Sequence, residues 1–253
     1  MANYKIKLKI AGLPIRLNLK NISLDFMEKF NRRYSNFKYT AGDFKHTVSP
    51  NFTDRVTVAE DLIFKKKRNL FKIEGRGMNV FFSPLQTGGE ILENIHILDS
   101  LLRIIYSRLL ITQNGFLIHA SAASGEIYTG PAGSGKTTSV QENKEMLGDD
   151  IVSIKKTKNQ WKIFSTPFTG EFEGLVKNKT ENLDRINILT TETDDISSGG
   201  IYKTLLKNII YYIDVNGGLK KLTDYCQDIA GTVPARGYYK SARKLKNNRL
   251  ATR

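Results

Sequence analysis

The first twenty residues of the chain alternate between apolar and polar side chains. Apolar residues occupy every second position from Tyr4 to Ile10, with lysines between them, and the alternation returns from Ile15 to Leu19. A period of two is typical of a strand with one buried face. The residues between the two segments include glycine and proline, which favour a turn. The pattern therefore predicts a β-hairpin.

Helical spacing begins after Ser23. The apolar residues Phe26, Met27 and Phe30 fall on one face of a helix, and serine is a common residue immediately before a first helical turn. We therefore expect a short helix here. Residues 31–60 are polar and poorly periodic, so the pattern predicts no regular element in them.

Three short apolar segments follow, at residues 62–64, 70–73 and 78–82. Charged residues and glycines separate them, which is typical of a β-meander. The basic run Lys65–Arg68 is expected at a hairpin tip. The pair Gly88-Gly89 is expected to end this part of the chain.

The next segment, residues 90–110, carries an apolar stripe at helical spacing and predicts a helix. His96 lies in this helix, where we expect a packed or surface side chain and not a ligand. The pair Asn114-Gly115 is a strong turn signal. Residues 116–121 and 126–129 then read as two strands on either side of a second turn.

A glycine-rich segment follows the second of these strands and matches the phosphate-loop pattern G-x-x-x-x-G-K-[ST] completely. Glycines allow backbone N–H groups to turn around an anion, and a helix beginning there directs its positive end at phosphates. Lys136 can reach the β- and γ-phosphates, and Thr137 can offer a hydroxyl to Mg²⁺. We expect nucleotide phosphates to bind at Gly130, Pro131, Ala132, Gly133, Ser134, Gly135, Lys136, Thr137 and Thr138.

Acidic residues near this loop are candidates for metal binding and proton transfer. The predicted strand Ile186–Leu189 is followed by Glu192 and makes only a weak Walker B motif. A closer pair, Asp149-Asp150, ends the segment that begins at Met146. Of two adjacent carboxylates, one can bind Mg²⁺ while the other accepts a proton from a hydroxyl group. A turn with two solvated aspartates is the plain alternative.

The net charge of +14 is unevenly distributed. Residues 1–113 carry +9, residues 114–239 carry −1 and residues 240–253 carry +6. A strong positive charge suggests an anionic partner, but the basic tail contains no aromatic residues, so nucleic-acid binding is not expected. The plain interpretation is a lysine-rich solvated surface with a frayed tail.

Composition narrows the class of protein further. The chain has 253 residues, of which 40% are hydrophobic and 25% charged, as in ordinary globular proteins. Its single cysteine, Cys226, excludes a disulfide framework and a cysteine-rich zinc site. The sequence has neither an apolar run long enough to span a membrane nor the apolar core of a secretory signal. We therefore expect a cytoplasmic protein, with homo-oligomerisation left open.

The order of these motifs resembles the HPr kinase/phosphorylase group, and especially its HPr-kinase-like relatives. The resemblance rests on His119 in LIHAS, the loop GPAGSGKTT, LGDD, and the later segment with Trp161 and TPFTGE, and it covers roughly residues 90–220. It implies an α/β fold with a phosphate-loop core like that of ATP-dependent phosphoenolpyruvate carboxykinase. The expected division is a smaller α+β region at 1–88, a kinase-like domain at 89–239 and the basic tail at 240–253.

The resemblance also implies residue roles. Lys136 and Thr137 would bind phosphate and Mg²⁺, Asp149 would be the general base, and Asp150 would help to hold the metal. His119 matches the family's active-site histidine, and Glu171 would be a further metal carboxylate. No clean counterpart of the signature segment of true HPr kinases is present, so phosphorylation of HPr itself is not supported.

These features together predict an ATP- and Mg²⁺-dependent kinase. Its acceptor would be a hydroxyl of a peptide, a protein or a small molecule, and similar stand-alone members of the family are associated with precursor peptides. An ATPase switch is one alternative; it would require a residue that positions water, and none is evident. A non-catalytic nucleotide-sensing module that binds an anionic partner through its basic N-terminal surface is the other.

Overall fold

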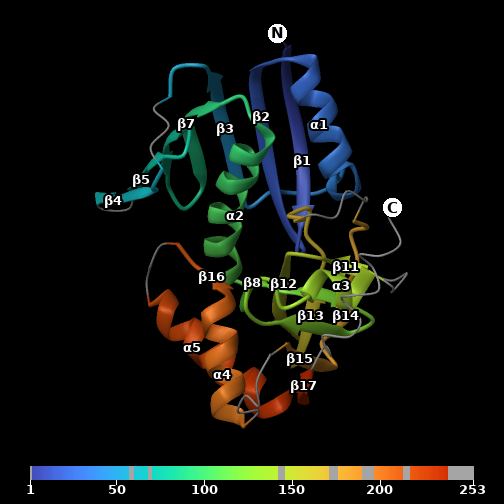
Figure 1. The fold of residues 1–253 in the computed structure, drawn as a ribbon. Coiled ribbons are helices and arrows are strands. Elements are labelled where there is room, and N and C mark those ends of the chain that lie inside the picture. The colour runs from blue at the N-terminus through green and yellow to red at the C-terminus, as the bar shows by residue number, and fades with distance from the viewer. Residues whose placement is uncertain are drawn as a thin grey trace.

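The computed structural model describes residues 2–56, 60–67, 70–141, 146–170, 176–189, 197–212 and 217–238. Over these ranges the chain is a mixed α/β protein with five α-helices and three β-sheets. Figure 1 shows a large sheet in the upper part, two smaller sheets in the lower part, and helix α2 passing from one part to the other. The expected basic tail, 240–253, lies outside the described residues.

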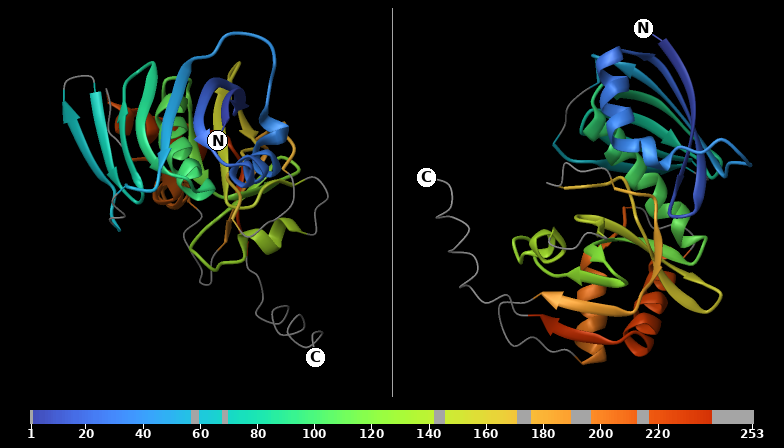
Figure 2. Two further views of the ribbon diagram at one scale, coloured as in Figure 1. Left: turned by 90° about the horizontal axis from the view of Figure 1, so that it is seen from above. Right: turned by 90° about the vertical axis from the view of Figure 1, so that its right-hand side faces the viewer.

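The large sheet is built from the first part of the chain. Its seven strands run in the order β1-β2-β3-β7-β6-β5-β4. Helices α1 and α2 pack on one face, and the residues of this face form one continuous core with both helices (Figure 2). The elements are β1 (Ala2–Ile10), β2 (Leu13–Ile22), α1 (Leu24–Tyr34), the 3₁₀ turn η1 (Ser35–Phe37), β3 (His46–Thr53), β4 (Ile63–Lys67), β5 (Leu70–Gly75), β6 (Met78–Phe82), β7 (Gln86–Leu92) and α2 (Ile95–Ile111).

The elements predicted from clear periodicity are confirmed. Strands β1 and β2 form the expected antiparallel hairpin, and β4, β5 and β6 form the expected meander. Helix α1 begins after Ser23, whose Oγ accepts a hydrogen bond from the Phe26 backbone N–H. Alternating burial along the hairpin fixes its register, because a shift by one residue would turn the apolar set to solvent.

The polar stretch 31–60, in which no element was predicted, contains strand β3. Its inward-facing residues are His46, Val48, Pro50 and Phe52, which are buried. His46 is polar and Pro50 is a poor strand former, and this hides the period of two. The strand forms because it lies between β2 and β7, parallel to both.

The prediction that Gly88-Gly89 ends the first region and that a helix begins at residue 90 is wrong. Both glycines lie inside β7, and α2 begins at Ile95 after the N-cap Asn94. The backbone at Gly89 has φ of 135°, and a Cβ there would lie 2.4 Å from the Asn79 carbonyl oxygen. Glycine therefore allows close approach of β7 and β6, and it does not mark a chain break.

Buried His46 gives the large sheet a predicted pH dependence. Its Nδ1 lies 3.2 Å from the Pro84 carbonyl oxygen and its Nε2 lies 2.8 Å from Thr87 Oγ1. Burial lowers the pKa of His46 to about 4, the Pro84 hydrogen bond partly opposes this, and the Arg108 charge lowers it further. The ring is therefore neutral in the folded protein at pH 7.

Because the unfolded histidine binds its proton near pH 6.5 and the folded one near pH 4, the contribution of His46 to stability is complete above pH 6.5. It is lost as the pH falls toward 4, by up to about 3 kcal/mol in the free energy of unfolding. The free energy of unfolding, measured with urea at several pH values, should fall less steeply from pH 6.5 toward pH 4 for His46→Gln than for the wild type. The exposed His96→Gln variant is the control, and equal slopes in both variants would contradict the assignment.

The second part of the chain forms two five-stranded sheets and three helices. One sheet has the order β11-β9-β10-β15-β17, and the other is antiparallel with the order β14-β13-β12-β8-β16. The elements are β8 (Gly115–His119), β9 (Ser121–Ala123), β10 (Glu126–Thr129), α3 (Lys136–Gln141), β11 (Met146–Gly148), β12 (Ile151–Thr157), β13 (Gln160–Phe164), β14 (Thr180–Asn182), β15 (Arg185–Leu189), α4 (Ser198–Asn208), β16 (Ile209–Ile210), α5 (Gly218–Thr232) and β17 (Ala235–Tyr238).

The two parts of the chain are not separate in their packing. Residues Leu117, Ile151 and Phe168 of the second part belong to the same hydrophobic cluster as the large sheet. A second cluster lies between the smaller sheets and helices α4 and α5. Helix α2 therefore packs against both parts of the chain. Its side chains have defined positions relative to each part.

None of the helices in the described ranges has both the length and the apolar character needed to cross a membrane.

Candidate functional site

The glycine-rich segment lies between a strand and a helix, as the motif requires. Strand β10 ends at Thr129, and helix α3 begins at Lys136. β10 lies beside the parallel strand β15, so the loop leaves the carboxyl end of parallel strands. Lys136 Nζ folds back and donates to the carbonyl oxygens of Gly130 at 3.0 Å and Pro131 at 2.8 Å.

The loop offers room and unused polar groups. Gly133 has φ of 74°, and a Cβ placed there would meet no atom within 4 Å, so the space beside it is open. Ser134 Oγ is buried and has no hydrogen-bond partner among the described residues. Burial lowers the pKa of Lys136, and the Asp150 carboxylate offsets part of this effect. An anion in the loop would favour the charged form of Lys136 further.

The pair Asp149-Asp150 follows β11 and precedes β12, as the sequence suggested. The register of β12 on β8 places Ile151 opposite His119, and the Ala120 backbone N–H donates to the Asp150 carbonyl oxygen at 3.0 Å. The His119 carbonyl oxygen also accepts a hydrogen bond from Thr129 Oγ1 at 3.1 Å. These contacts hold His119, the two aspartates and the start of the phosphate loop together.

Asp150 is the carboxylate surrounded by positive groups. His119 Nδ1 lies 3.5 Å from Asp150 Oδ1, and Arg103 Nη2 lies 3.9 Å from Oδ2. Burial raises the pKa of Asp150, but the His119 hydrogen bond and the charges of His119, Arg103 and Lys136 outweigh it and leave the pKa below its usual value. Asp150 is therefore ionised at neutral pH, and its side chain is 30% exposed.

Asp149 has a different environment. It is 2% exposed, its Oδ1 accepts the Gly170 backbone N–H at 3.2 Å, and its carbonyl oxygen accepts from Ser121 Oγ at 2.6 Å. Thr137 Oγ1 also donates to this carbonyl at 3.3 Å. Asp149 therefore links the first turn of α3 to the segment that ends at Gly170.

Arg103 is the site residue that sequence reasoning missed. It lies in the middle of α2, its Nε is buried without a hydrogen-bond partner among the described residues, and its guanidinium carbon is 5.6 Å from the centre of the Phe168 ring. Periodicity identifies α2 as a helix but does not show that its polar position 103 faces a segment far along the chain. No local motif marks it.

Other expected ligands are only partly placed. Glu171, expected as a metal ligand, and Glu192, at the weak Walker B position, lie outside the described residues. Thr138 is in the first turn of α3. In the ranges that the structure describes, no three His, Cys, Asp or Glu side chains cluster as a metal site. The Thr137 hydroxyl at the start of α3 and the Asp150 carboxylate, which interacts with Lys136, are oxygen groups of the hard type that Mg²⁺ prefers.

Comparison of the chain with models of known protein families finds no match. Comparison with curated proteins finds no significant match either.

Proposed function

We propose that this chain is an ATP- and Mg²⁺-dependent kinase. It binds the nucleotide phosphates at residues 130–138 and transfers the γ-phosphoryl group to a hydroxyl of a peptide, a protein or a small molecule. The observation that carries the proposal is the ionised Asp150 carboxylate beside His119, Arg103 and the loop lysine Lys136. A phosphate loop alone would serve any nucleotide-binding protein, whereas a carboxylate placed beside it suits proton transfer.

The strand, loop and helix support the phosphate-binding part of the proposal. Backbone N–H groups of the loop, the buried Ser134 Oγ and Lys136 Nζ are donors for phosphate oxygens. In the described structure Lys136 Nζ is bonded to two loop carbonyls, so it is held within reach of the loop centre. Arg103 adds a second positive charge beside Asp150.

The two carboxylates are proposed to have different tasks. The family resemblance implied Asp149 as base and Asp150 as metal ligand. The geometry favours Asp150 as the base because its side chain is partly exposed, whereas Asp149 is buried. The acceptor oxygen attacks the γ-phosphorus, the bond to the bridging oxygen of ADP breaks, and the hydroxyl proton passes to Asp150. His119 orients this carboxylate, and Asp149 positions Gly170.

The residues present are compatible with magnesium. The Thr137 hydroxyl would hold the ion together with phosphate oxygens and water, and Asp150 is the alternative protein ligand. Bound Mg²⁺ would neutralise part of the phosphate charge. The arrangement of loop, His119 and paired aspartates also supports the finer fold proposal, a phosphoenolpyruvate carboxykinase-like or HPr-kinase-like core.

Labelled ATP tests the proposal. The wild-type chain is incubated with a cell extract and with ATP labelled in either the γ- or the α-phosphate. We expect an acceptor to gain label from γ-labelled ATP and none from α-labelled ATP, and Lys136→Ala should abolish this transfer. Release of inorganic phosphate without a labelled acceptor would favour the ATPase switch and contradict the kinase proposal, as would an absence of turnover.

A further inference from the structure

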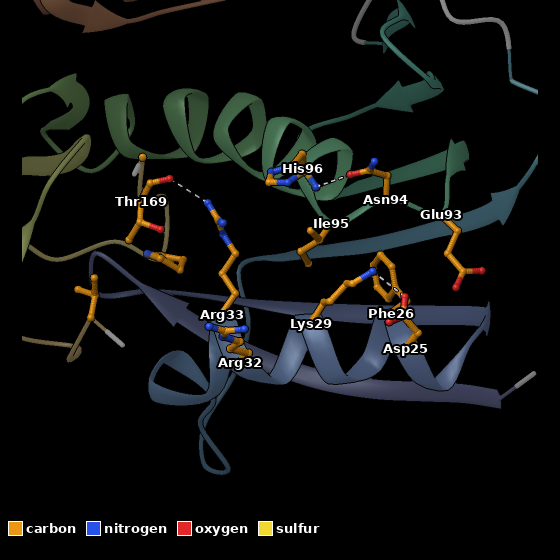
Figure 3. Close-up of a pocket in the computed structure, with 13 residues that line it drawn as sticks. Asp25, Phe26, Lys29, Arg32, Arg33, Glu93, Asn94, Ile95, His96 and Thr169 are labelled. Carbon is orange, nitrogen blue, oxygen red and sulfur yellow. Dashed lines mark hydrogen bonds and ion pairs between the residues drawn. The ribbon is translucent and has the colours of Figure 1, made fainter. Parts of the chain in front are cut away.

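Two pockets along helix α2 differ in how their charges are balanced. Figure 3 shows the pocket between α1 and the first turn of α2, where Asp25 and Glu93 accompany basic side chains of α1. The second pocket has a volume of about 200 Å³ and lies at the other end of the helix, beside Arg108 and Gln113. Lys45 also lines it, and no aspartate or glutamate among the described residues does. Of the two pockets, the second therefore carries positive charge that no acidic side chain of its lining offsets.

The guanidinium of Arg108 lies over two aromatic rings. Its central carbon is 4.3 Å from the centre of the Phe82 ring and 5.1 Å from that of the Phe71 ring. Such rings attract the cation, but they do not accept the N–H groups that lie in the guanidinium plane. The guanidinium forms no hydrogen bond or ion pair with any residue that the structure describes, and its Nη1 is buried. Because Arg108 also lines the pocket, part of its side chain can be reached from there.

The end of α2 does not need Arg108 as a hydrogen-bond donor. Arg108 lies in the last turn, where a basic side chain can satisfy the final carbonyl groups of a helix. Three of these carbonyls accept hydrogen bonds from other donors: Leu109 from Thr112 Oγ1 at 2.8 Å, Leu110 from the Gln113 N–H at 2.8 Å, and Ile111 from the Tyr225 hydroxyl at 3.3 Å. The N–H groups of Arg108 are therefore not used by the helix that carries them.

No carboxylate of the described residues offsets the charge of Arg108. Burial lowers the pKa of Arg108, and no acidic neighbour raises it. The charge of Arg108 lowers the pKa of His46, which is neutral at pH 7. Asp43 is the acid closest to Lys45 in the sequence, but it raises the pKa of Tyr39 and does not line the pocket. An anion in the pocket would thus lie beside an unpaired cation.

The rest of the lining indicates which kind of anion fits. Leu13, Pro84 and Leu109 are apolar, whereas Thr112 and Gln113 are polar and uncharged. A guanidinium can bind a carboxylate through two parallel N–H···O bonds, and apolar walls favour a hydrocarbon group over a second charged group. The volume is below the roughly 300 Å³ at which pockets for drug-sized ligands begin. A short organic acid meets all three conditions.

We propose that this pocket binds a short-chain organic carboxylate. The carboxylate lies against Arg108, with Lys45 as a second positive charge, and the hydrocarbon chain lies along Leu13, Pro84 and Leu109. This site is separate from the proposed kinase reaction, because it uses neither a nucleotide nor any group of the phosphate loop.

Titration of the ¹⁵N-labelled wild-type chain with sodium butanoate tests the proposal by NMR. Ionic strength is held constant with sodium chloride, and the pH is neutral. We expect saturable shifts of the backbone amides of Leu109, Thr112 and Gln113, with a roughly millimolar dissociation constant for so small a ligand. Shifts that do not saturate, or that are largest in the loop at residues 130–138, would overturn the proposal.

Two variants and a neutral analogue test the role of the charge. Arg108→Met keeps a long side chain over the rings and should weaken butanoate binding by at least about tenfold. Arg55→Met removes an exposed guanidinium that does not line the pocket, and it should leave the affinity unchanged. Butanamide, which has the same length and no charge, should bind the wild type at least about tenfold more weakly. This comparison decides the question even if Arg108→Met does not fold.

Inorganic phosphate tests the class of anion. The competition uses the Lys136→Ala chain, in which the phosphate loop lacks its charged contact. Phosphate should not displace butanoate at equal concentration, because it has no hydrocarbon group for the apolar walls. Displacement by phosphate, butanamide binding as tight as that of butanoate, or equal loss of affinity in Arg108→Met and Arg55→Met would each overturn the assignment.

Discussion

Replacement of Asp150 by asparagine should lower phosphoryl transfer to the acceptor by roughly 10²–10⁴-fold, the usual effect of losing a positioned base. Asparagine keeps the shape of the side chain but cannot accept the hydroxyl proton. MgATP affinity should change by no more than a few fold, because the base acts in the transfer step and not in ground-state binding. Single-turnover transfer and calorimetric titration measure the two effects separately.

Asp149→Asn is the matched control. Its Oδ1 can still accept the Gly170 N–H, so transfer should fall by less than about tenfold. If instead Asp150→Asn loses Mg²⁺-dependent affinity, Asp150 is a metal ligand, and His119 becomes the next candidate for the base. A wild-type rate in Asp150→Asn would contradict any catalytic role for this carboxylate.

Replacement of Lys136 by alanine should abolish detectable turnover and weaken MgATP binding by at least about tenfold, since the loop loses its charged contact with the phosphates. The fold should survive because, among the described residues, the hydrogen bonds of Lys136 Nζ go to carbonyls of its own loop. Lys203→Ala removes the same charge at an exposed position on α4 and should change neither property. Equal MgATP affinity in folded Lys136→Ala and wild type would refute the loop assignment.

The periodicity of apolar residues predicted most of the elements in the first part of the chain. It failed where a buried position is occupied by a residue that is not typical of a buried strand. The hairpin β1–β2 and helix α1 have clean periods, whereas β3 buries His46 and Pro50 and so reads as a polar stretch. Gly88 and Gly89 read as a break because a sequence does not show that β6 approaches β7 closely at Asn79. Tertiary contacts, and not local preference, decided both elements.

Some residues of the candidate site could likewise be predicted from local sequence motifs, and others could not. The phosphate loop and the aspartate pair are recognisable because each is a short continuous motif, and His119 is identified through the family resemblance. Arg103 and the pocket beside Arg108 come from helix α2 packed against segments far from it along the chain, and no spacing in the sequence brings them together. The family resemblance implied roles for the two aspartates, and their burial favours the reverse assignment.

Calorimetric titration of the wild-type chain with ATP, in the presence and absence of Mg²⁺, measures whether the glycine-rich loop binds a nucleotide. We expect one saturable site per chain, with a dissociation constant of roughly 1 µM to 1 mM that tightens with Mg²⁺ and is competed by ADP. No saturable binding of ATP in this range, with the protein folded, would contradict it.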